Sequence, residues 1–229
     1  MITVVVPVYN ESDILGANIV RLAKAMDSLG RDYEIIIAED GSTDGSLAVA
    51  EKLKSRRVRI LNSGNRIGRG LTLRNAMIAA KGGIIVHTDA DLATDPMQIE
   101  KLIAGVENGL DICVGSRLLP GSKVHGRSLA REVSSRGYNL LVRALFKTSV
   151  RDHQCGFKAF RKSTLLPMLE HVQDRHWFWD TELLIRAQSK GLRVSEIPVA
   201  WTDRSRSNVR LSSDILYMGL AALRLRLRI

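Results

Sequence analysis

The sequence predicts an α/β fold whose core is an open, doubly wound and mostly parallel sheet with flanking helices. Two observations support this prediction. Short runs rich in β-branched residues alternate along the chain with longer amphipathic stretches, which is the order of elements in proteins built from βαβ units. The short runs are apolar throughout rather than at alternate positions, as expected for strands that are buried on both faces of a parallel sheet.

The first 116 residues supply most of this pattern. Ser12, Thr43 and Asp95 stand where N-caps are expected, and Pro96 follows Asp95 at a first helical position. The strands expected here cover residues 2–7, 33–38, 58–61, 84–88 and 111–115, and the helices cover residues 13–29, 44–55, 70–80 and 96–108. This alternating order predicts right-handed crossovers between parallel strands.

Residues 117–162 differ from the part before them because they are strongly basic. They hold eleven Lys and Arg residues against two acidic ones, which is most of the chain's formal net charge of +10. A charge of this size predicts an anionic partner, such as a phosphorylated ligand, an acidic lipid surface or nucleic acid. The residue pattern predicts a basic amphipathic helix over residues 129–146, another helix over 180–190 and a strand over 193–198.

The C-terminal segment, residues 211–229, contains an apolar run from Ile215 to Leu223. The run is shorter than the roughly 20 residues that a membrane-spanning helix needs, but it suits a helix that lies in a membrane interface. We expect this helix to reach only about Leu223, because leucine and arginine alternate strictly after that residue, as they would in a strand. An ordinary terminal helix packed on the domain is the alternative.

The composition indicates a globular protein of the cytoplasm. Hydrophobic residues make up 45% of the 229 residues and charged residues 25%, which excludes a disordered chain. The apolar N-terminus lacks a basic flank and is interrupted by Pro7, so we expect no export signal. Cys113 and Cys155 lie in unrelated contexts, which predicts a reducing compartment and no structural disulfide.

Polar clusters follow three of the predicted strands, where a doubly wound sheet binds its ligand. They are Tyr9-Asn10-Glu11 after the first strand, residues 39–45 after the second, and Asp89-Ala90-Asp91 after the fourth. The preference of Asp and Asn for turns explains any one cluster. Three clusters at the same edge of one sheet favour a binding site for a cation or for a ligand with a sugar and a base.

Asp89 and Asp91 form the sharpest of these clusters. Two carboxylates separated by one small residue can converge on a hard divalent ion, and Mg²⁺ or Mn²⁺ takes one or two carboxylates together with substrate phosphate oxygens. Glycine-rich phosphate loops are missing, since Gly68-Arg69-Gly70 is not followed by a third glycine. Phosphate binding therefore falls to the metal and to arginines, whose planar guanidinium matches phosphate oxygens. The candidates are Arg117, Arg127, Arg131, Arg136, Arg204, Arg206 and Arg210.

As an ordered set, these motifs resemble a known enzyme family. Residues 7–11, residues 39–45, Asp89-Ala90-Asp91 and Gly115-Ser116-Arg117 are similar to the inverting GT-A glycosyltransferases of the large family that includes cellulose synthases. Residues 152–160, 177–184 and 196–201 narrow the resemblance to dolichyl-phosphate sugar synthases, and Gln154-Cys155-Gly156-Phe157-Lys158 is closer to the glucosyl than to the mannosyl enzymes.

The resemblance covers residues 1–210 and implies a GT-A catalytic domain there. Residues 1–116 would bind the nucleotide sugar and residues 117–210 the acceptor, with residues 211–229 as a C-terminal interfacial helix that can associate with membrane. Some relatives have a Gln two residues after the second Asp as an extra metal ligand, and this chain has Ala93 instead.

The resemblance also implies site roles at the matched positions. The nucleotide sugar would contact Pro7, Tyr9, Asn10, Glu11, Asp40, Gly41, Ser42, Asp89, Ala90, Asp91, Arg204 and Arg206. Mg²⁺ or Mn²⁺ would bind Asp89 and Asp91, and the acceptor phosphate would contact Arg117, Arg127, Arg131 and Arg210. Asp91, Arg117 and Arg131 are the residues expected to carry catalysis.

The implied reaction moves a hexose from UDP-glucose or GDP-mannose to a polyprenyl (dolichyl) phosphate, as in protein glycosylation. The enzyme would make peripheral contact with the inner face of the membrane and bind no nucleic acid. An ionised phosphate acceptor needs no general base. The alternative is transfer to a sugar hydroxyl in polysaccharide or glycolipid synthesis, with Asp180 as the base. A sugar-nucleotide pyrophosphorylase is disfavoured because Tyr9-Asn10-Glu11 stands where its glycine-rich loop would be, and a nucleic-acid-binding module because only 5% of residues are aromatic.

Overall fold

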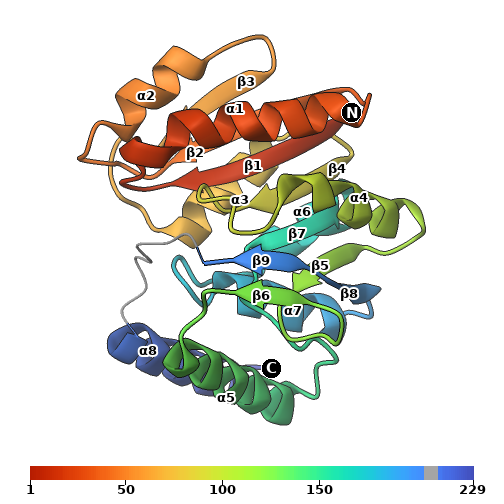
Figure 1. The fold of residues 1–229 in the computed structure, drawn as a ribbon. Coiled ribbons are helices and arrows are strands. Elements are labelled where there is room, and N and C mark those ends of the chain that lie inside the picture. Colours follow the sequence, from red (N-terminus) through yellow and green to blue (C-terminus); the bar gives the residue numbers. More distant parts are fainter. Residues whose placement is uncertain (204–210) are drawn as a thin grey trace.

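A seven-stranded, mostly parallel sheet forms the centre of the computed structural model, which describes residues 1–203 and 211–229 (Figure 1). The strand order is β3-β2-β1-β4-β7-β5-β8, and β7 runs antiparallel to both of its neighbours. The strands are β1 (Ile2–Val8), β2 (Tyr33–Glu39), β3 (Val58–Asn62), β4 (Ile84–Thr88), β5 (Ile112–Ser116), β7 (Phe157–Arg161) and β8 (Val194–Pro198). The predicted α/β class is therefore confirmed, but β7 was not predicted.

Helices cover both faces of the sheet and build two separate cores. Helices α1, α2 and α4 pack on one face, and α3, α6 and α7 pack on the other. Their bounds are α1 (Ser12–Ser28), α2 (Ser46–Leu53), α3 (Arg69–Ala79), α4 (Ile99–Glu107, preceded by the 3₁₀ turn η1, Pro96–Gln98), α6 (Lys162–Leu169) and α7 (Trp179–Ser189). A small parallel pair, β6 (Lys123–His125) and β9 (Ala200–Thr202), lies beside the main sheet.

The two cores explain why the strand runs are apolar without alternation. In β1, the side chains of Val4 and Val6 belong to the core under α1, whereas Val5 belongs to the opposite core under α3. Every residue of β2 is likewise buried. Since successive side chains of a strand point to opposite faces, a strand with helices on both sides needs apolar residues at nearly every position.

Two of the three predicted helix caps are wrong. Ser12 is already the first residue of α1, and Thr43 lies three residues before α2 begins. One carboxylate serves both helix starts, because Asp44 accepts hydrogen bonds from the backbone N–H of Ser12 and from the N–H and hydroxyl of Ser46. Asp95 does cap its turn, where it accepts from the N–H of Met97. Burial acts to raise the pKa of Asp44, but these hydrogen bonds outweigh it and lower the pKa to about 2.

Helices α5 (Leu129–Phe146) and α8 (Leu211–Arg226) lie side by side at the foot of the molecule in Figure 1. The first has the predicted bounds. The second extends past Leu223, so the predicted end and the strand considered for the last seven residues are wrong. Met218 and Ala222 of α8 are buried against Tyr138 of α5, and together they form a third core that also includes Ile185 of α7. Within the described residues, no helix is both long and apolar enough to cross a membrane.

Candidate active site

A cavity of about 700 Å³ opens beyond the carboxyl ends of β1, β2 and β4, where the sequence predicted the ligand to bind. Most of the predicted site residues line this cavity, together with residues of helices α5 and α8. The lining includes Pro7, Tyr9, Asn10, Glu11, Asp40, Asp89, Ala90, Asp91, Arg117, Arg127 and Arg131 of the predicted set, together with Arg66, Arg69, Tyr138, Gln154, Gly156, Trp177, Asp180, Ile215 and Met218. Arg204, Arg206 and Arg210 lie outside the described residues.

Gly41 and Ser42 do not line this cavity but hold the loops that do. The Ser42 hydroxyl accepts from the backbone N–H of Asn10 at 3.0 Å, and the Asn10 side chain accepts from the N–H of Thr43 at 2.8 Å. Asn10 has a φ of +56°, a left-handed conformation that Asn tolerates better than most residues. Gly41 has a φ of +69°, and a Cβ atom there would clash with the backbone of Asn65. These residues therefore shape the loops after β1 and β2.

Asp40 and Tyr9 define the end of the cavity that was expected to bind the nucleotide. The Asp40 carboxylate accepts from the N–H groups of Ile67 and Gly68 and from the Thr72 hydroxyl, and so anchors the loop before α3. The guanidinium of Arg66 lies over the Tyr9 ring, 3.9 Å from its centroid. Sequence reasoning missed Arg66, because nothing in its local pattern distinguishes it from a surface arginine.

The loop after β4 places the two carboxylates of Asp89-Ala90-Asp91 in the cavity. Asp91 accepts from the N–H of Ala93. Leu92 is held at a φ of +46°, a strained backbone for a leucine of the kind that gathers at functional sites. A Cβ atom at Gly156, the residue directly before β7, would overlap the carboxylate of Asp89. The absence of a side chain at Gly156 therefore makes the space in which Asp89 lies.

These residues fit a divalent ion that brings part of its own coordination shell. Within the described ranges, no group of three or more His, Cys, Asp or Glu side chains could hold a metal by itself. Two carboxylates, in a cavity roomy enough for a diphosphate, match the habit of Mg²⁺ and Mn²⁺ to combine one or two carboxylates with substrate phosphate oxygens. Ala93 offers no side-chain ligand, so the donor set on the protein would be Asp89 and Asp91.

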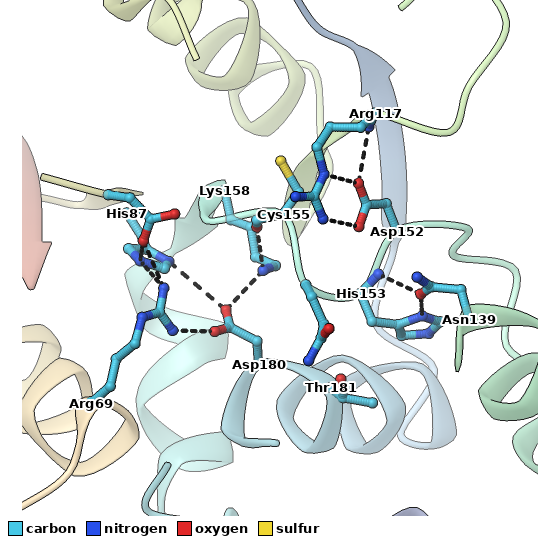
Figure 2. Close-up of polar contacts among 12 residues, drawn as sticks. Arg69, His87, Arg117, Asn139, Asp152, His153, Cys155, Lys158, Asp180 and Thr181 are labelled. Carbon is cyan, nitrogen blue, oxygen red and sulfur yellow. Dashed lines mark hydrogen bonds and ion pairs between the residues drawn. The ribbon is translucent and has the colours of Figure 1, made fainter. Parts of the chain in front are cut away.

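A charged cluster lies next to these carboxylates and joins elements that are far apart in sequence (Figure 2). Arg69, at the start of α3, donates to Asp180 of α7 at 2.6 Å and to Asp89 at 2.8 Å. The same guanidinium lies 3.1 Å from Nε2 of His87. Because an arginine can only donate, that nitrogen accepts and the proton of the neutral ring is assigned to Nδ1. Arg69 is the residue that sequence reasoning treated only as part of an absent phosphate loop.

Asp180 is buried and paired with two cations. Besides Arg69, the ammonium group of Lys158 lies 2.8 Å from it. Lys158 itself is completely buried in β7. Burial acts to raise the pKa of Asp180, but the charges of Lys158 and Arg69 outweigh it and hold that pKa well below its usual range. The two cations therefore favour the charged form of Asp180 and already occupy its carboxylate oxygens.

Glu11 behaves in the opposite way. Its carboxyl lies in the cavity with no cation among its main influences, and burial together with the nearby charges of Asp91, Asp89 and Asp44 raises its pKa to about 7. The cavity is thus lined by a carboxyl whose pKa lies near neutral pH.

Arginines of the basic region line the same cavity as Tyr9 and Asp40, and one of them, Arg131, belongs to α5. Arg117 donates from its side chain twice to the buried carboxylate of Asp152, at 2.7 and 2.8 Å, and also from its backbone N–H. Arg131 donates to Asp203 at 2.8 Å. Arg127 lies in the loop just before α5 and also lines the cavity. The structure thus brings together the three described arginines that were predicted to face an acceptor phosphate.

Comparison with known proteins gives a consistent result. The family model described as "Glycosyl transferase family 2" matches residues 3–166. The chain is 42% identical over 97% of its length to "Glycosyltransferase AglD" of Haloferax volcanii, of which it spans only 36%. It is 30% identical over 93% of its length to "Dolichyl-phosphate beta-glucosyltransferase ALG5C" of Trichomonas vaginalis, of which it spans 67%. A dolichyl-phosphate beta-glucosyltransferase of Dictyostelium discoideum is 29% identical over 99% of the chain, which covers 74% of that relative.

Solved structures share the fold. Glucosyl-3-phosphoglycerate synthase of Mycobacterium tuberculosis, in complex with UDP, superposes with a TM-score of 0.74 over all of this chain and 80% of its own, at 21% identity. A complex of that synthase with Mn²⁺, UDP and glucosyl-3-phosphoglycerate gives the same TM-score over 99% of this chain and 79% of its own, at 20% identity. At this level of identity the likeness concerns the fold, which is GT-A.

Proposed function

Since the chain belongs to glycosyl transferase family 2, we propose that this glycosyltransferase moves one hexose from a nucleotide sugar to a polyprenyl phosphate, in a metal-dependent reaction that inverts the anomeric centre. UDP-glucose and GDP-mannose are the candidate donors. The names of two relatives, both dolichyl-phosphate beta-glucosyltransferases, support this acceptor class and favour glucose.

The observation that carries the proposal is the pairing of Asp180 with Lys158 and Arg69. An acceptor that is a sugar hydroxyl must lose a proton to a base, and Asp180 is the residue that this alternative needs. A carboxylate held between two cations, with its pKa depressed by them, is a poor proton acceptor. A phosphate monoester is already ionised near neutral pH, so its oxygen can attack the anomeric carbon without a base.

The remaining groups divide between the two substrates. Asp89 and Asp91 would hold Mg²⁺ or Mn²⁺, which when bound neutralises charge on the leaving nucleoside diphosphate. Tyr9, which lines the cavity, would contact the base. Arg117, Arg127 and Arg131 would orient the acceptor phosphate for in-line attack, mainly by fixing its position. A single displacement from the face opposite the leaving group inverts the sugar.

The acceptor is a lipid, so we also propose peripheral contact with an anionic membrane, at its cytoplasmic face. Helices α5 and α8 support this, because each lines the cavity with one side and exposes apolar residues on another. The exposed apolar side chains on these helices are Leu129, Val133, Leu140, Leu141, Leu216, Leu220 and Leu223, and the exposed Leu227 directly follows α8. Arginines stand among them, including Arg136 and Arg224. Exposed leucines with flanking arginines suit an anionic lipid surface, which attracts each such charge by about 1 kcal/mol.

An acceptor screen tests the proposal directly. UDP-glucose and GDP-mannose are each incubated with Mn²⁺ and either a short polyprenyl phosphate or the polyprenol of the same length, and free UDP or GDP is measured. We expect nucleotide release only with the phosphate, and loss of release with EDTA or in Asp91→Ala. Transfer to the polyprenol would contradict the proposed acceptor class.

A charge-balanced variant tests the absence of a base. Asp180→Asn alone would leave the buried Lys158 without its partner, which is strongly destabilising, so it is combined with Lys158→Met. We expect the double variant to retain most of its turnover with polyprenyl phosphate. Complete loss of turnover in a folded double variant, as judged by circular dichroism, would instead favour a base role for Asp180 and transfer to a hydroxyl.

A further inference from the structure

Arg69 links the expected metal site to Asp180, because its guanidinium donates hydrogen bonds to both Asp89 and Asp180. The guanidinium has a side-chain exposure of 18% and uses one nitrogen for Asp180 and the other for Asp89 and His87. It also lies 5.6 Å from the centroid of a Trp177 ring. These contacts fix the arginine in one position at the wall of the cavity.

Neutralising Asp180 does not require Arg69. Lys158 is already 2.8 Å from that carboxylate, donates to the carbonyl of Cys155 as well, and is completely buried. What Arg69 adds is its second hydrogen bond, 2.8 Å to Asp89 Oδ1. Asp89 differs from Asp180 in being half-exposed to the cavity, with a side-chain exposure of 45%. The arginine thus places a fixed positive charge on the carboxylate that would bind a metal.

We propose that Arg69 is a positioning residue that pairs with Asp89 as long as no metal ion is bound there. As a result, a divalent cation binds tightly only when a nucleoside diphosphate binds with it. This inference rests on the proposed role of Asp89 as a metal ligand. A cation arriving alone meets one carboxylate already paired and the repulsion of a guanidinium. A diphosphate offers oxygens both to the metal ion and to the guanidinium of Arg69. When the metal binds Asp89, Arg69 can therefore donate to the diphosphate instead.

The proposal predicts a coupling between metal and nucleotide that depends on Arg69. Binding coupling is reciprocal and is commonly between about 5-fold and 150-fold. Removing the arginine charge leaves Asp89 available to a lone metal, so the affinity for metal alone rises. The same change removes one hydrogen-bond donor to the diphosphate, so the increase in metal affinity that the nucleotide causes becomes smaller. Both shifts follow from one side chain and neither requires turnover.

The experiment is calorimetric titration of the full chain with MnCl₂, alone and with saturating UDP or GDP, in the wild type and in Arg69→Met. We expect Arg69→Met to bind Mn²⁺ alone about tenfold more tightly and to lose about tenfold of the nucleotide-dependent gain. Arg74→Met is the matched control, since Arg74 lies on the same helix but donates to the carbonyl of Leu169 on α6. It should behave as the wild type.

Unchanged Mn²⁺ affinities in Arg69→Met, with and without nucleotide, would overturn the proposal and leave Arg69 as a structural cross-link. If that variant does not fold, Arg69→Gln, which is neutral and can still donate to Asp180, must show the same direction of change. A failure of the proposed function has a different signature, because then the wild type does not bind Mn²⁺ even with UDP or GDP.

Discussion

Gly156 shapes the candidate metal site although it contributes no side chain to it. Its missing side chain leaves the space for the Asp89 carboxylate, so Gly156→Ala should displace that carboxylate and abolish Mn²⁺ binding in the presence of UDP or GDP. Isothermal titration measures the loss. Gly137→Ala, on the exposed helix α5 where a Cβ atom would meet nothing within 4 Å, should bind metal normally and gain roughly 0.5–1 kcal/mol of stability. Normal metal affinity in Gly156→Ala would contradict this account.

Glu11 makes the stability of the folded protein depend on pH, and the direction of its pKa shift gives the sign. Its pKa rises from 4.5 to about 7 on folding, through burial and then the charges of Asp91, Asp89 and Asp44. The folded protein therefore binds more protons than the unfolded chain between these values, and this carboxyl makes the metal-free protein less stable as pH rises through that window. Glu11→Gln removes the effect.

Thermal unfolding in EDTA at pH 5 and pH 8 measures this contribution. We expect Glu11→Gln to match the wild type at pH 5 and to exceed it at pH 8 by about 1 kcal/mol, a value reduced for partial exposure, or roughly 2–4 °C. Buried His153, whose pKa is lowered to about 3 mainly by burial, destabilises both proteins equally in acid and cancels in the comparison. An equal difference at both pH values would show that Glu11 does not titrate as described.

Sequence reasoning found the residues that topology alone brings together. Asp40, Asp89 and Asp91 each follow a strand, and parallel strands end at one edge of a sheet, so their convergence follows from their order. The cluster of Arg69, Lys158 and Asp180 has no such signal, since its members lie on α3, β7 and α7, up to 111 residues apart. The sequence pointed to Lys158 and Asp180 only through the resemblance of residues 152–160 and 177–184 to an enzyme family, and it gave no sign that they pair.

At the scale of elements, β7 was missed for a physical reason. Its residues 157–161 include a lysine and an arginine, which interrupt the apolar run expected of a central strand. Lys158 is nevertheless completely buried, because its ammonium group pairs with Asp180 and with the Cys155 carbonyl. An ionic partner that sequence does not reveal thus allows a charged residue in the middle of the sheet.

The C-terminal end of the chain exposes two leucines, one in the last turn of α8 and one directly after the helix. Leu223 and Leu227 are exposed by 47% and 89%, whereas Leu225 between them is buried against the domain. Replacing both exposed leucines with serine should leave the fold intact and weaken binding to phosphatidylserine vesicles by on the order of tenfold or more, since each buried leucine contributes about 1.5–3 kcal/mol. Flotation with vesicles at low and high salt measures it.

The matched control is Val20→Ser together with Ile78→Ser, two side chains exposed by 47% and 51% on α1 and α3. These helices do not belong to the α5 and α8 pair, so the control should bind vesicles as the wild type does. Equal flotation of all three proteins would mean that the α8 leucines do not contact lipid.

At the scale of the whole molecule, charge and topology act together. Most of the net charge of +10 lies in residues 117–162, and this stretch supplies α5 and arginines that line the cavity, whereas the carboxylates come from the ends of β1, β2 and β4. A single cavity thus collects carboxylates and arginines from separate parts of the chain. The sequence predicted both groups, but only the fold shows that they line one ligand-sized space.

The position of β7 has a consequence for how the protein is made. This strand joins β4 to β5, which do not pair with each other, so a nascent chain that ends at Ser116 contains β5 but neither of the strands that pair with it. The ribosome must add residues 117–161 first, which takes on the order of a few seconds. During that interval the edges of β4 and β5 that pair with β7 in the folded protein have no partner strand. We therefore expect chaperone contacts, mapped by selective ribosome profiling, to peak while this stretch is being synthesised and to fall once β7 has emerged.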